Sequence, residues 1–346
     1  MNIKLEILDP LSFPEWDKLI LANNDYSFFH SSSWARVLSA SYGYKPLYFA
    51  LTSRDKLLVA IPIMEVNSIL TGHRGVSLPF SDYCEPISDR TVNFKDVLHQ
   101  LIDYGNKRHW NYFELRGGGQ FLQEEQNYTQ YYGHSLTLQQ REEEVFSSFR
   151  NSTKRNIKKA VKEGVSVRIS NSIESLTEFY RLNCITRKKH GLPPQPYYFF
   201  KSLHEHIISK KNGFLMLASH QERVVAGAIY FHYGKKAIFK YGASDQIYQH
   251  LRANNLVMWE AVKKYCLDGY DTLFLGRTET NNKGLRQFKA GWGAEENTIH
   301  YYRYDFKKKS FAKGRSPVGP NYNKVFSRIP VPLLKIIGTM LYRHAG

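Results

Sequence analysis

The sequence predicts an α+β fold in which helices flank a mixed, mostly antiparallel sheet. Strand-like and helix-like segments are interspersed along the whole chain, and several strands follow one another directly, an order typical of α+β domains. Hydrophobic residues make up 42% of the 346 residues, which is enough for a sizeable core and excludes a disordered chain. The length suits two domains better than one.

The first half is expected to alternate short strands and helices. Ile3, Leu5 and Ile7 alternate with polar residues, which predicts a strand. The pattern Ser12–Glu15 resembles a capping box and predicts a helix that runs to Leu21. The other expected elements are a helix capped by Ser33, paired strands at 46–51 and 57–64, an amphipathic helix at 92–108 and a strand at 112–115.

The second half begins with a basic helix over Arg150–Lys162, which Gly164 ends. The remaining expectations are strands at 165–169, 214–219, 224–233, 238–244, 272–275 and 299–303, helices at 173–189, 197–209 and 253–267, and a glycine-rich loop at 284–293. Because 111–117 and 270–276 occupy similar places in the two halves, we infer a duplicated architecture. The predicted domains are therefore 1–140 and 141–306, followed by a basic linker and amphipathic tail at 307–346, with 314–320 as linker-like sequence.

The chain carries a strong positive charge. It has 48 Lys and Arg against 31 Asp and Glu, a net charge of +17. Such an excess indicates an anionic partner: a nucleic acid, a phosphate-bearing substrate or an anionic membrane surface. A small phosphate ligand alone would need only a few cations, but the charge does not choose among these partners.

Several chemical classes are excluded. The three cysteines lie far apart without a CxxC pair, which argues against a disulfide framework and against zinc. There is no HExxH motif, and His204 and His206 fall on opposite sides of a helix, so no metal site is expected. GxSxG and P-loop motifs are also missing. Without a signal-peptide core or an apolar run of about 18 residues, a cytoplasmic location is expected.

The tail from 326 to 342 is apolar with basic residues interspersed. Arg328 and Lys335 interrupt a run of Ile, Val, Pro and Leu that is too short to span a bilayer. Two alternatives stand: the segment lies on a membrane surface, or it docks on the protein. The first alternative predicts peripheral contact with the inner face of the cell membrane.

Several segments resemble the FemAB-like branch of the GNAT acyltransferase superfamily. They are 155–160 (RNIKKA), 240–243 (KYGA), 259–261 (WEA), 274–277 (FLGR), 288–293 (FKAGWG) and, in the first half, 79–83 (PFSDY). The tail segment 328–334 is similar to the exosortase (PEP-CTERM) associated FemAB subgroup. The resemblance covers almost the whole chain and implies two GNAT-like domains in tandem with a substrate cleft where they meet.

The resemblance also implies an activity. Known members transfer an amino acid from aminoacyl-tRNA to the amine of a peptidoglycan precursor, so we expect an acyl or aminoacyl transferase that acts on a cell-envelope precursor of peptidoglycan or exopolysaccharide. No bound cofactor is expected, and the co-substrate would be aminoacyl-tRNA or acyl-CoA. This chain lacks the coiled-coil arm of larger Fem proteins. At 249–255 it also departs from the glycine-containing CoA pyrophosphate loop of ordinary GNATs, which puts a CoA donor in doubt.

Lys289 is the principal catalytic candidate. Acyl transfer to an amine passes through a tetrahedral oxyanion, and a pre-placed cation in a dry cleft contributes about 3 kcal/mol to its stabilisation. The resemblance assigns this position a transition-state role, whereas spacing alone favours a solvated lysine near a turn. Asp82 is the second candidate, to orient or deprotonate the acceptor amine, and the alternative is an Asp that caps a turn.

The remaining candidates are substrate-binding residues. Arg277 ends an apolar strand and suits a phosphate or carboxylate, or else forms an ion pair with Glu279 or Asp245. Arg155 belongs to a charge run that is either a solvated face or a phosphate contact. The other expected substrate contacts are Arg36, Tyr83, Asn156, Tyr241, Phe288 and Trp292.

Two other functions remain open. The first is a GNAT acyltransferase that uses acyl-CoA. The second is a basic module without catalysis, which holds RNA or anionic lipid through Arg150–Lys162 and the tail.

Overall fold

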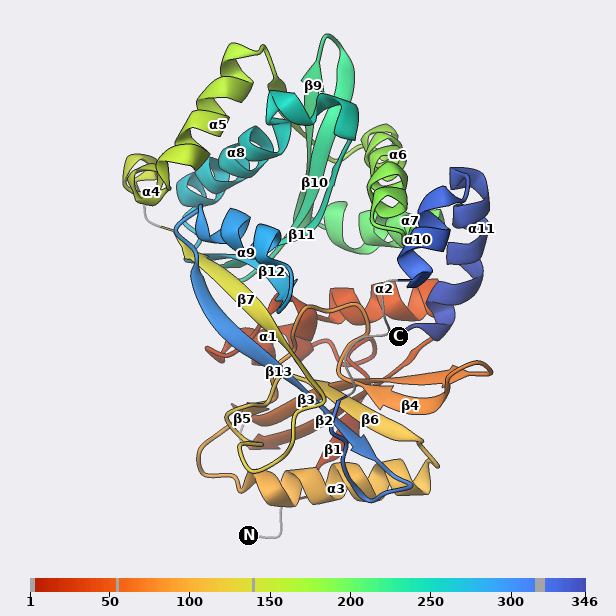
Figure 1. Ribbon diagram of the computed structural model, residues 1–346. Coiled ribbons are helices and arrows are strands. Elements are labelled where there is room, and N and C mark those ends of the chain that lie inside the picture. The colour runs from red at the N-terminus through yellow and green to blue at the C-terminus, as the bar shows by residue number, and fades with distance from the viewer. Residues whose placement is uncertain (1–3, 54–55, 139–140, 315–320) are drawn as a thin grey trace. The chain divides into compact units, whose positions relative to one another are not determined.

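The computed structural model describes residues 4–53, 56–138, 141–314 and 321–346, and the chain divides into two compact units (Figure 1). The first unit contains the residues up to Tyr131, Thr298–Pro317 and Leu341–Gly346, and the second contains Tyr132–Asn297 and Val318–Met340. This division differs from the predicted domains, 1–140, 141–306 and 307–346, because two strands each contribute residues to both units. They are β7 (Thr129–Thr137) and β13 (Glu295–Asp305). The linker-like sequence 314–320 lies outside the described residues apart from Gly314.

The first unit is built on a mostly antiparallel sheet. Its strands follow the order β1 (Glu6–Leu8), β2 (Lys45–Ser53), β3 (Lys56–Ser68), β4 (Gly72–Val76), β6 (Tyr112–Arg116) and β13, with β5 (Ile87–Ser88) on β3 and β14 (Ser310–Phe311) on β13. Its helices are α1 (Trp16–Leu21), α2 (Ser32–Tyr42) and α3 (Phe94–Lys107). Strands β4 and β6 pair in parallel, and the connection between them contains α3.

The second unit repeats this plan. Strands β8 (Ser166–Ser170), β9 (Gly213–His220), β10 (Arg223–Tyr233) and β11 (Lys236–Ser244) pair antiparallel, and β12 (Thr272–Glu279) pairs with β11 in parallel through α8 (Ala253–Leu267). Its other α-helices are α4 (Glu142–Ser148), α5 (Asn151–Lys162), α6 (Ile173–Lys189), α7 (Tyr197–Leu203), α9 (Lys283–Ala290), α10 (Asn321–Arg328) and α11 (Val331–Leu341). A helical connection between parallel strands in each unit supports the duplicated architecture, and the predicted α+β class is confirmed.

Each unit has its own hydrophobic core. In the first, Val97 and Leu101 of α3 pack with strand residues such as Phe113. In the second, Val262 and Tyr265 of α8 belong to the core that lies against β9 and β10. Burial of each such side chain contributes about 1.5–3 kcal/mol, so these helices hold the sheets on which the site is built.

Most predicted elements are confirmed, and the helices over 173–189 and 253–267 have the predicted bounds. The glycine-rich loop at 284–293 was a wrong expectation, because helix α9 begins there, with Asn282 accepting a hydrogen bond from the Leu285 backbone N–H. No capping box forms at Ser12, whose hydroxyl donates to the Asp9 carbonyl instead. Helix α2 is capped by Ser31 rather than Ser33.

Candidate active site

The sheet of the second unit opens between β11 and β12. Among the described residues, the two strands pair only from Lys236–Thr272 to Ile238–Phe274. Both strands lose their regular geometry just beyond that point. The pairing of β11 with β10 shifts register between Phe239 and Tyr241, and Gly276 on β12 has a φ of 78°. A bulge bends its strand and a positive φ suits glycine, so the two irregularities account for the separation.

Lys289 reaches this opening from the last turn of α9. Its side chain is buried, with 4% of its surface exposed. The ammonium donates hydrogen bonds to the carbonyl oxygens of Gly276 at 2.7 Å and Arg277 at 3.0 Å. A buried ammonium must be hydrogen-bonded to remain charged, and these carbonyls fix it without cancelling its charge. The solvated-lysine alternative is therefore wrong, whereas the transition-state role stays a prediction.

Arg277 and Tyr241 lie on the two strands that separate. Arg277 follows Gly276 on β12 and is half-buried, and Tyr241 is half-buried on β11. Asp245, one of the two suggested ion partners of Arg277, has an Arg223 guanidinium nitrogen 3.8 Å from its carboxylate and caps the turn at Ile247. The structure thus brings Tyr241, Arg277 and Lys289 to one end of the parallel strand pair.

Phe288 lies on helix α9, and Trp292, just after the helix, packs against it. Trp292 is fully buried, and its ring packs edge-on against Phe149 at 5.0 Å and against Phe288 at 6.1 Å between centroids. The structure therefore gives Trp292 a packing role, and its expected contact with substrate stays a prediction. Phe288 is half-buried.

Helix α5 is fastened to the end of α9. The Arg150 backbone N–H and the Thr153 hydroxyl donate to the Gly291 carbonyl, at 3.0 and 2.9 Å. A Cβ on Gly291 would lie 2.7 Å from the Thr153 hydroxyl oxygen, so glycine permits this close approach. Arg155 is exposed and Asn156 half-exposed on the same helix. The basic helix and the Lys289 segment are thus one connected substructure.

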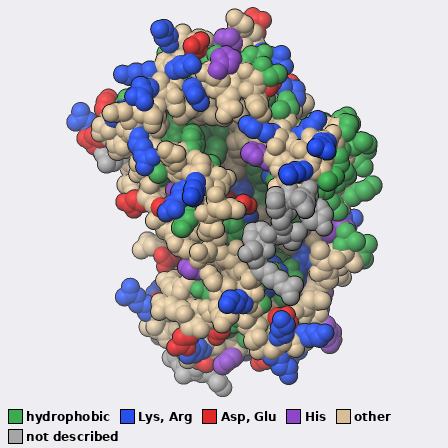
Figure 2. All heavy atoms as spheres, viewed as in Figure 1, with side chains coloured by type: hydrophobic (Ala, Val, Ile, Leu, Met, Phe, Trp, Pro, Cys, Tyr) green, Lys and Arg blue, Asp and Glu red, His purple; other side chains and the backbone are tan. Residues whose placement is uncertain are grey.

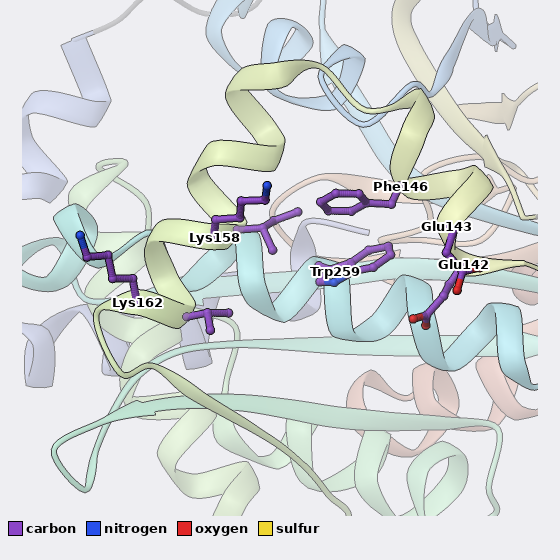
Figure 3. Close-up of a pocket in the computed structure, with 8 residues that line it drawn as sticks. Glu142, Glu143, Phe146, Lys158, Lys162 and Trp259 are labelled. Carbon is purple, nitrogen blue, oxygen red and sulfur yellow. The ribbon is translucent and has the colours of Figure 1, made fainter.

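A groove of about 530 Å³ runs beside α5 (Figure 3). Phe146 of α4 and Trp259 of α8 form its aromatic part, with ring centroids 4.9 Å apart. Its lining also includes Ile157, Val161, Lys158, Lys162, Glu142 and Glu143. Lys158 and Lys162 lie along one side of α5, and the two glutamates lie on α4 (Figure 3). Aromatic rings beside exposed lysines suit a ligand with a planar group and a phosphate.

His134 on β7 was not predicted. It is fully buried, and its Nε2 lies 3.1 Å from a carboxylate oxygen of Glu296. The two oxygens of that carboxylate each accept a hydrogen bond of 2.6 Å from the Arg286 guanidinium. Burial lowers the pKa of His134, and the positive charge of Lys289 lowers it further. The imidazole is therefore neutral at pH 7. No motif marks it among the 13 histidines, so sequence reasoning had no signal for it.

Asp82 and Tyr83 lie in one loop of the first unit. Arg116 donates to the Leu78 carbonyl at 3.1 Å, and the Tyr301 hydroxyl donates to the Asp82 carbonyl at 2.6 Å. Burial raises the pKa of the Tyr83 phenol, which therefore stays protonated at neutral pH. The loop backbone is thus held in place, which favours a positioning role for Tyr83 over proton abstraction.

The first unit also contains Arg36, which is exposed on α2. A buried charge network in the same unit was not predicted. Glu114 accepts hydrogen bonds from Arg116 at 3.1 Å and from Arg303 at 2.6 Å. Burial raises the pKa of Glu114, but the two guanidinium groups outweigh it and hold that pKa below its usual value. This network stabilises the strands on which the Asp82 loop rests.

Residues 4–53, 56–138, 141–314 and 321–346 contain no group of three His, Cys, Asp or Glu side chains placed to hold a metal ion. No helix in these ranges is long and apolar enough to cross a membrane.

The comparisons with known proteins confirm the tandem GNAT-like units of the predicted fold. Residues 147–294 match the acetyltransferase (GNAT) domain family, and this range contains α5, the β11–β12 opening and Lys289. No curated protein matches the sequence.

Solved structures share the fold of almost the whole chain. FemX superimposes with a TM-score of 0.70 at 13% identity, over 86% of this chain and 97% of FemX. A tandem GNAT protein from the clavulanic acid biosynthesis pathway reaches 0.56 at 7% identity, over 88% and 98% of the two chains. The C-terminal domain of an Agrobacterium fabrum protein named as a lysylphosphatidylglycerol synthetase reaches 0.54 at 11%, over 84% and 90%. The exosortase-associated subgroup stays a prediction.

Proposed function

With a GNAT domain at residues 147–294 and the fold of FemX as its premise, we propose that this protein is an aminoacyltransferase that acts on an envelope precursor. It would move an aminoacyl group from aminoacyl-tRNA to an amine of a peptidoglycan or exopolysaccharide precursor that is linked to a lipid or a nucleotide. The observation that carries the proposal is the buried Lys289 ammonium, held by two backbone carbonyls where β11 and β12 separate.

The proposed reaction is direct transfer. The acceptor nitrogen attacks the ester carbonyl carbon, so a C–N bond forms and the carbonyl oxygen becomes an oxyanion. The intermediate then collapses, the ester C–O bond breaks, and the ribose hydroxyl leaves with the proton that the amine gives up. A cation close to the developing oxyanion lowers the barrier most in a site that excludes water. Lys289 has the burial and the rigid support for that role.

The other residues are proposed to position the substrates. Arg277, Tyr241 and Phe288 would contact the donor near its acyl end, because they lie on the elements that carry Lys289. Asp82 and Tyr83 would orient the acceptor amine, and Arg36 would contact an acidic group of the acceptor. Trp292 would act through its packing under α9.

A nucleic-acid donor is favoured over CoA by two features. The segment in front of α8 is a 3₁₀ helix at Gln246–Leu251 followed by Arg252, rather than a glycine-containing phosphate loop. Exposed Arg155, Lys158 and Lys162 lie on α5, beside the aromatic groove, where a phosphate backbone could run. Acyl-CoA remains the second candidate donor, supported by the GNAT domain match, and the non-catalytic module remains the third function.

Transfer assays distinguish these functions. Labelled aminoacyl-tRNA and labelled acyl-CoA are each incubated with the protein and a membrane and precursor fraction, and incorporation of label is measured. Lys289→Met tests the cation, and Lys283→Met, an exposed lysine at the start of the same helix, is the matched control. Ribonuclease-sensitive transfer that is lost only in Lys289→Met supports the proposal. Transfer only from the CoA ester would replace the donor, and no transfer from either would favour the binding module.

A cytoplasmic location with peripheral contact at the inner face of the cell membrane belongs to the same proposal. A lipid-linked acceptor would be presented at that face. The net charge of +17 supports an anionic surface as a partner.

A further inference from the structure

The C-terminal part of the chain concentrates positive charge. From Phe306 to Gly346 there are nine Lys and Arg residues and no Asp or Glu, so this segment supplies nine of the seventeen net charges. The described part of this segment contains α10 and α11. A cationic segment without acidic residues is attracted to anionic surfaces and is repelled by another copy of itself.

Helix α11 is held on the second unit by its inner face. Leu334 is fully buried, and Gly338 lies so close to the chain that an added Cβ would be 2.0 Å from the Pro194 carbonyl oxygen. Lys335 adds a cation–π contact, with its Nζ 5.3 Å from the centre of the Tyr180 ring. The helix is therefore docked, and the orientation of its outer face is set by the folded unit.

The outer face of this docked pair of helices is apolar. Leu333, Ile336 and Met340 recur at helical spacing on α11 and are each more than half exposed, and Val325 on α10 is 61% exposed. Val325, Leu333 and Ile336 border a hollow of about 550 Å³ together with Ile329, Pro330 and Ile337, and its lining is almost entirely apolar except for Arg328. Figure 2 shows hydrophobic side chains gathered over α10 and α11, with Lys and Arg side chains beside them. An apolar patch of this kind on a folded protein marks an interaction site.

We propose that this face, defined by Val325, Leu333, Ile336 and Met340, docks on an anionic lipid membrane. The apolar side chains would enter the boundary between headgroups and acyl chains, and the surrounding cations would contact acidic headgroups. A second copy of the chain is a poor occupant, because it would bring two strongly basic segments together. The proposal assigns a surface to the peripheral contact proposed above, but it does not require the transfer reaction.

The test is flotation of the full chain with vesicles. Vesicles of phosphatidylcholine mixed with phosphatidylglycerol are compared with phosphatidylcholine alone, for the wild type and for Leu333→Ser/Ile336→Ser/Met340→Ser. The matched control is Ile69→Ser/Leu70→Ser, because these two apolar residues are also highly exposed, in the turn between β3 and β4. We expect the wild type to float with the anionic vesicles. The triple variant should bind them about tenfold or more weakly, and the control variant should bind them as well as the wild type.

The charge contribution has its own arm. Lys324→Gln/Arg328→Gln and added salt should both weaken flotation, because exposed charges are screened by ions. Equal flotation of the triple variant and the wild type would overturn the proposal, as would no flotation of the wild type. If the wild type and the control variant form a dimer in solution and the triple variant does not, this face binds a second copy of the chain instead of a membrane. Transfer activity is measured separately. A wild type that binds vesicles but transfers no label would contradict the proposed enzyme function and would still support the membrane-binding surface.

Discussion

The Lys289 ammonium lies 2.7 Å from the Gly276 carbonyl oxygen, and this hydrogen bond joins the last turn of α9 to the residue at which β12 departs from regular strand geometry. The lysine position and the opening of the sheet therefore depend on each other. A cation placed in this way needs no conformational change to meet a developing negative charge.

Loss of the Lys289 charge should reduce turnover strongly. In Lys289→Met we expect kcat to fall about 100- to 1000-fold, which is the effect of removing one oxyanion-stabilising group. Two buried carbonyls also lose their donor, so the free energy of unfolding should fall by about 1–3 kcal/mol. Initial rates and urea unfolding measure the two effects. If kcat is unchanged while stability falls, Lys289 has only a structural role, and Lys283→Met should change neither quantity.

Gly276 should resist substitution, whereas Gly284 should not. Gly276→Ala places a Cβ on a residue with φ of 78°, which costs about 1–2 kcal/mol of stability, and it displaces a carbonyl that holds Lys289. Gly284→Ala on exposed α9 meets no atom nearer than 4.0 Å and should stabilise the protein by about 0.5–1 kcal/mol. Thermal unfolding of both variants measures these changes in stability. An equal change for the two variants would contradict the strained geometry at Gly276.

His134 predicts a pH dependence of stability. Its pKa in the folded protein lies below its ordinary value of 6.5, so the unfolded state binds the proton more readily. Stability should therefore be fully present above about pH 6.5 and should fall as the pH decreases toward the folded pKa, by at most about 1.4 kcal/mol per pH unit. Urea unfolding of wild type and His134→Gln across this range isolates the residue, since the other histidines are common to both. Parallel curves for the two proteins would contradict the assignment.

The aromatic groove predicts a salt-dependent loss of RNA binding. Lys158→Gln/Lys162→Gln should weaken binding of single-stranded RNA and reduce the slope of log K against log salt by about 1.4, if each lysine contacts one phosphate. Lys210→Gln/Lys211→Gln removes two exposed lysines elsewhere in the second unit and is the control. The same slope for all three proteins would show that α5 is a solvated charged face.

Local patterns were sufficient for much of the fold. The long helix at 173–189 was predicted because Leu176, Phe179 and Tyr180 recur at helical spacing, and α6 buries all three. Helix α9 was missed because Gly284, Gly291 and Gly293 surround a short segment, and its cap at Asn282 precedes a weak apolar pattern. Strands β4 and β7 were missed because Gly, His and Tyr interrupt any simple alternation.

Residue type and local spacing were sufficient for the α+β class, the excess of positive charge and the basic helix at 150–162. The candidacy of Lys289 rested on the resemblance to the FemAB-like branch. The tertiary structure alone shows that Lys289 is buried against Gly276 and that β11 and β12 separate beside it. It also shows that the positive charge of Lys289 lowers the pKa of His134. The same holds for α11, whose outer apolar face exists because Leu334 and Gly338 turn the other face inward. Burial, hydrogen bonding and electrostatic coupling join residues that lie far apart in the chain, and no local pattern encodes them.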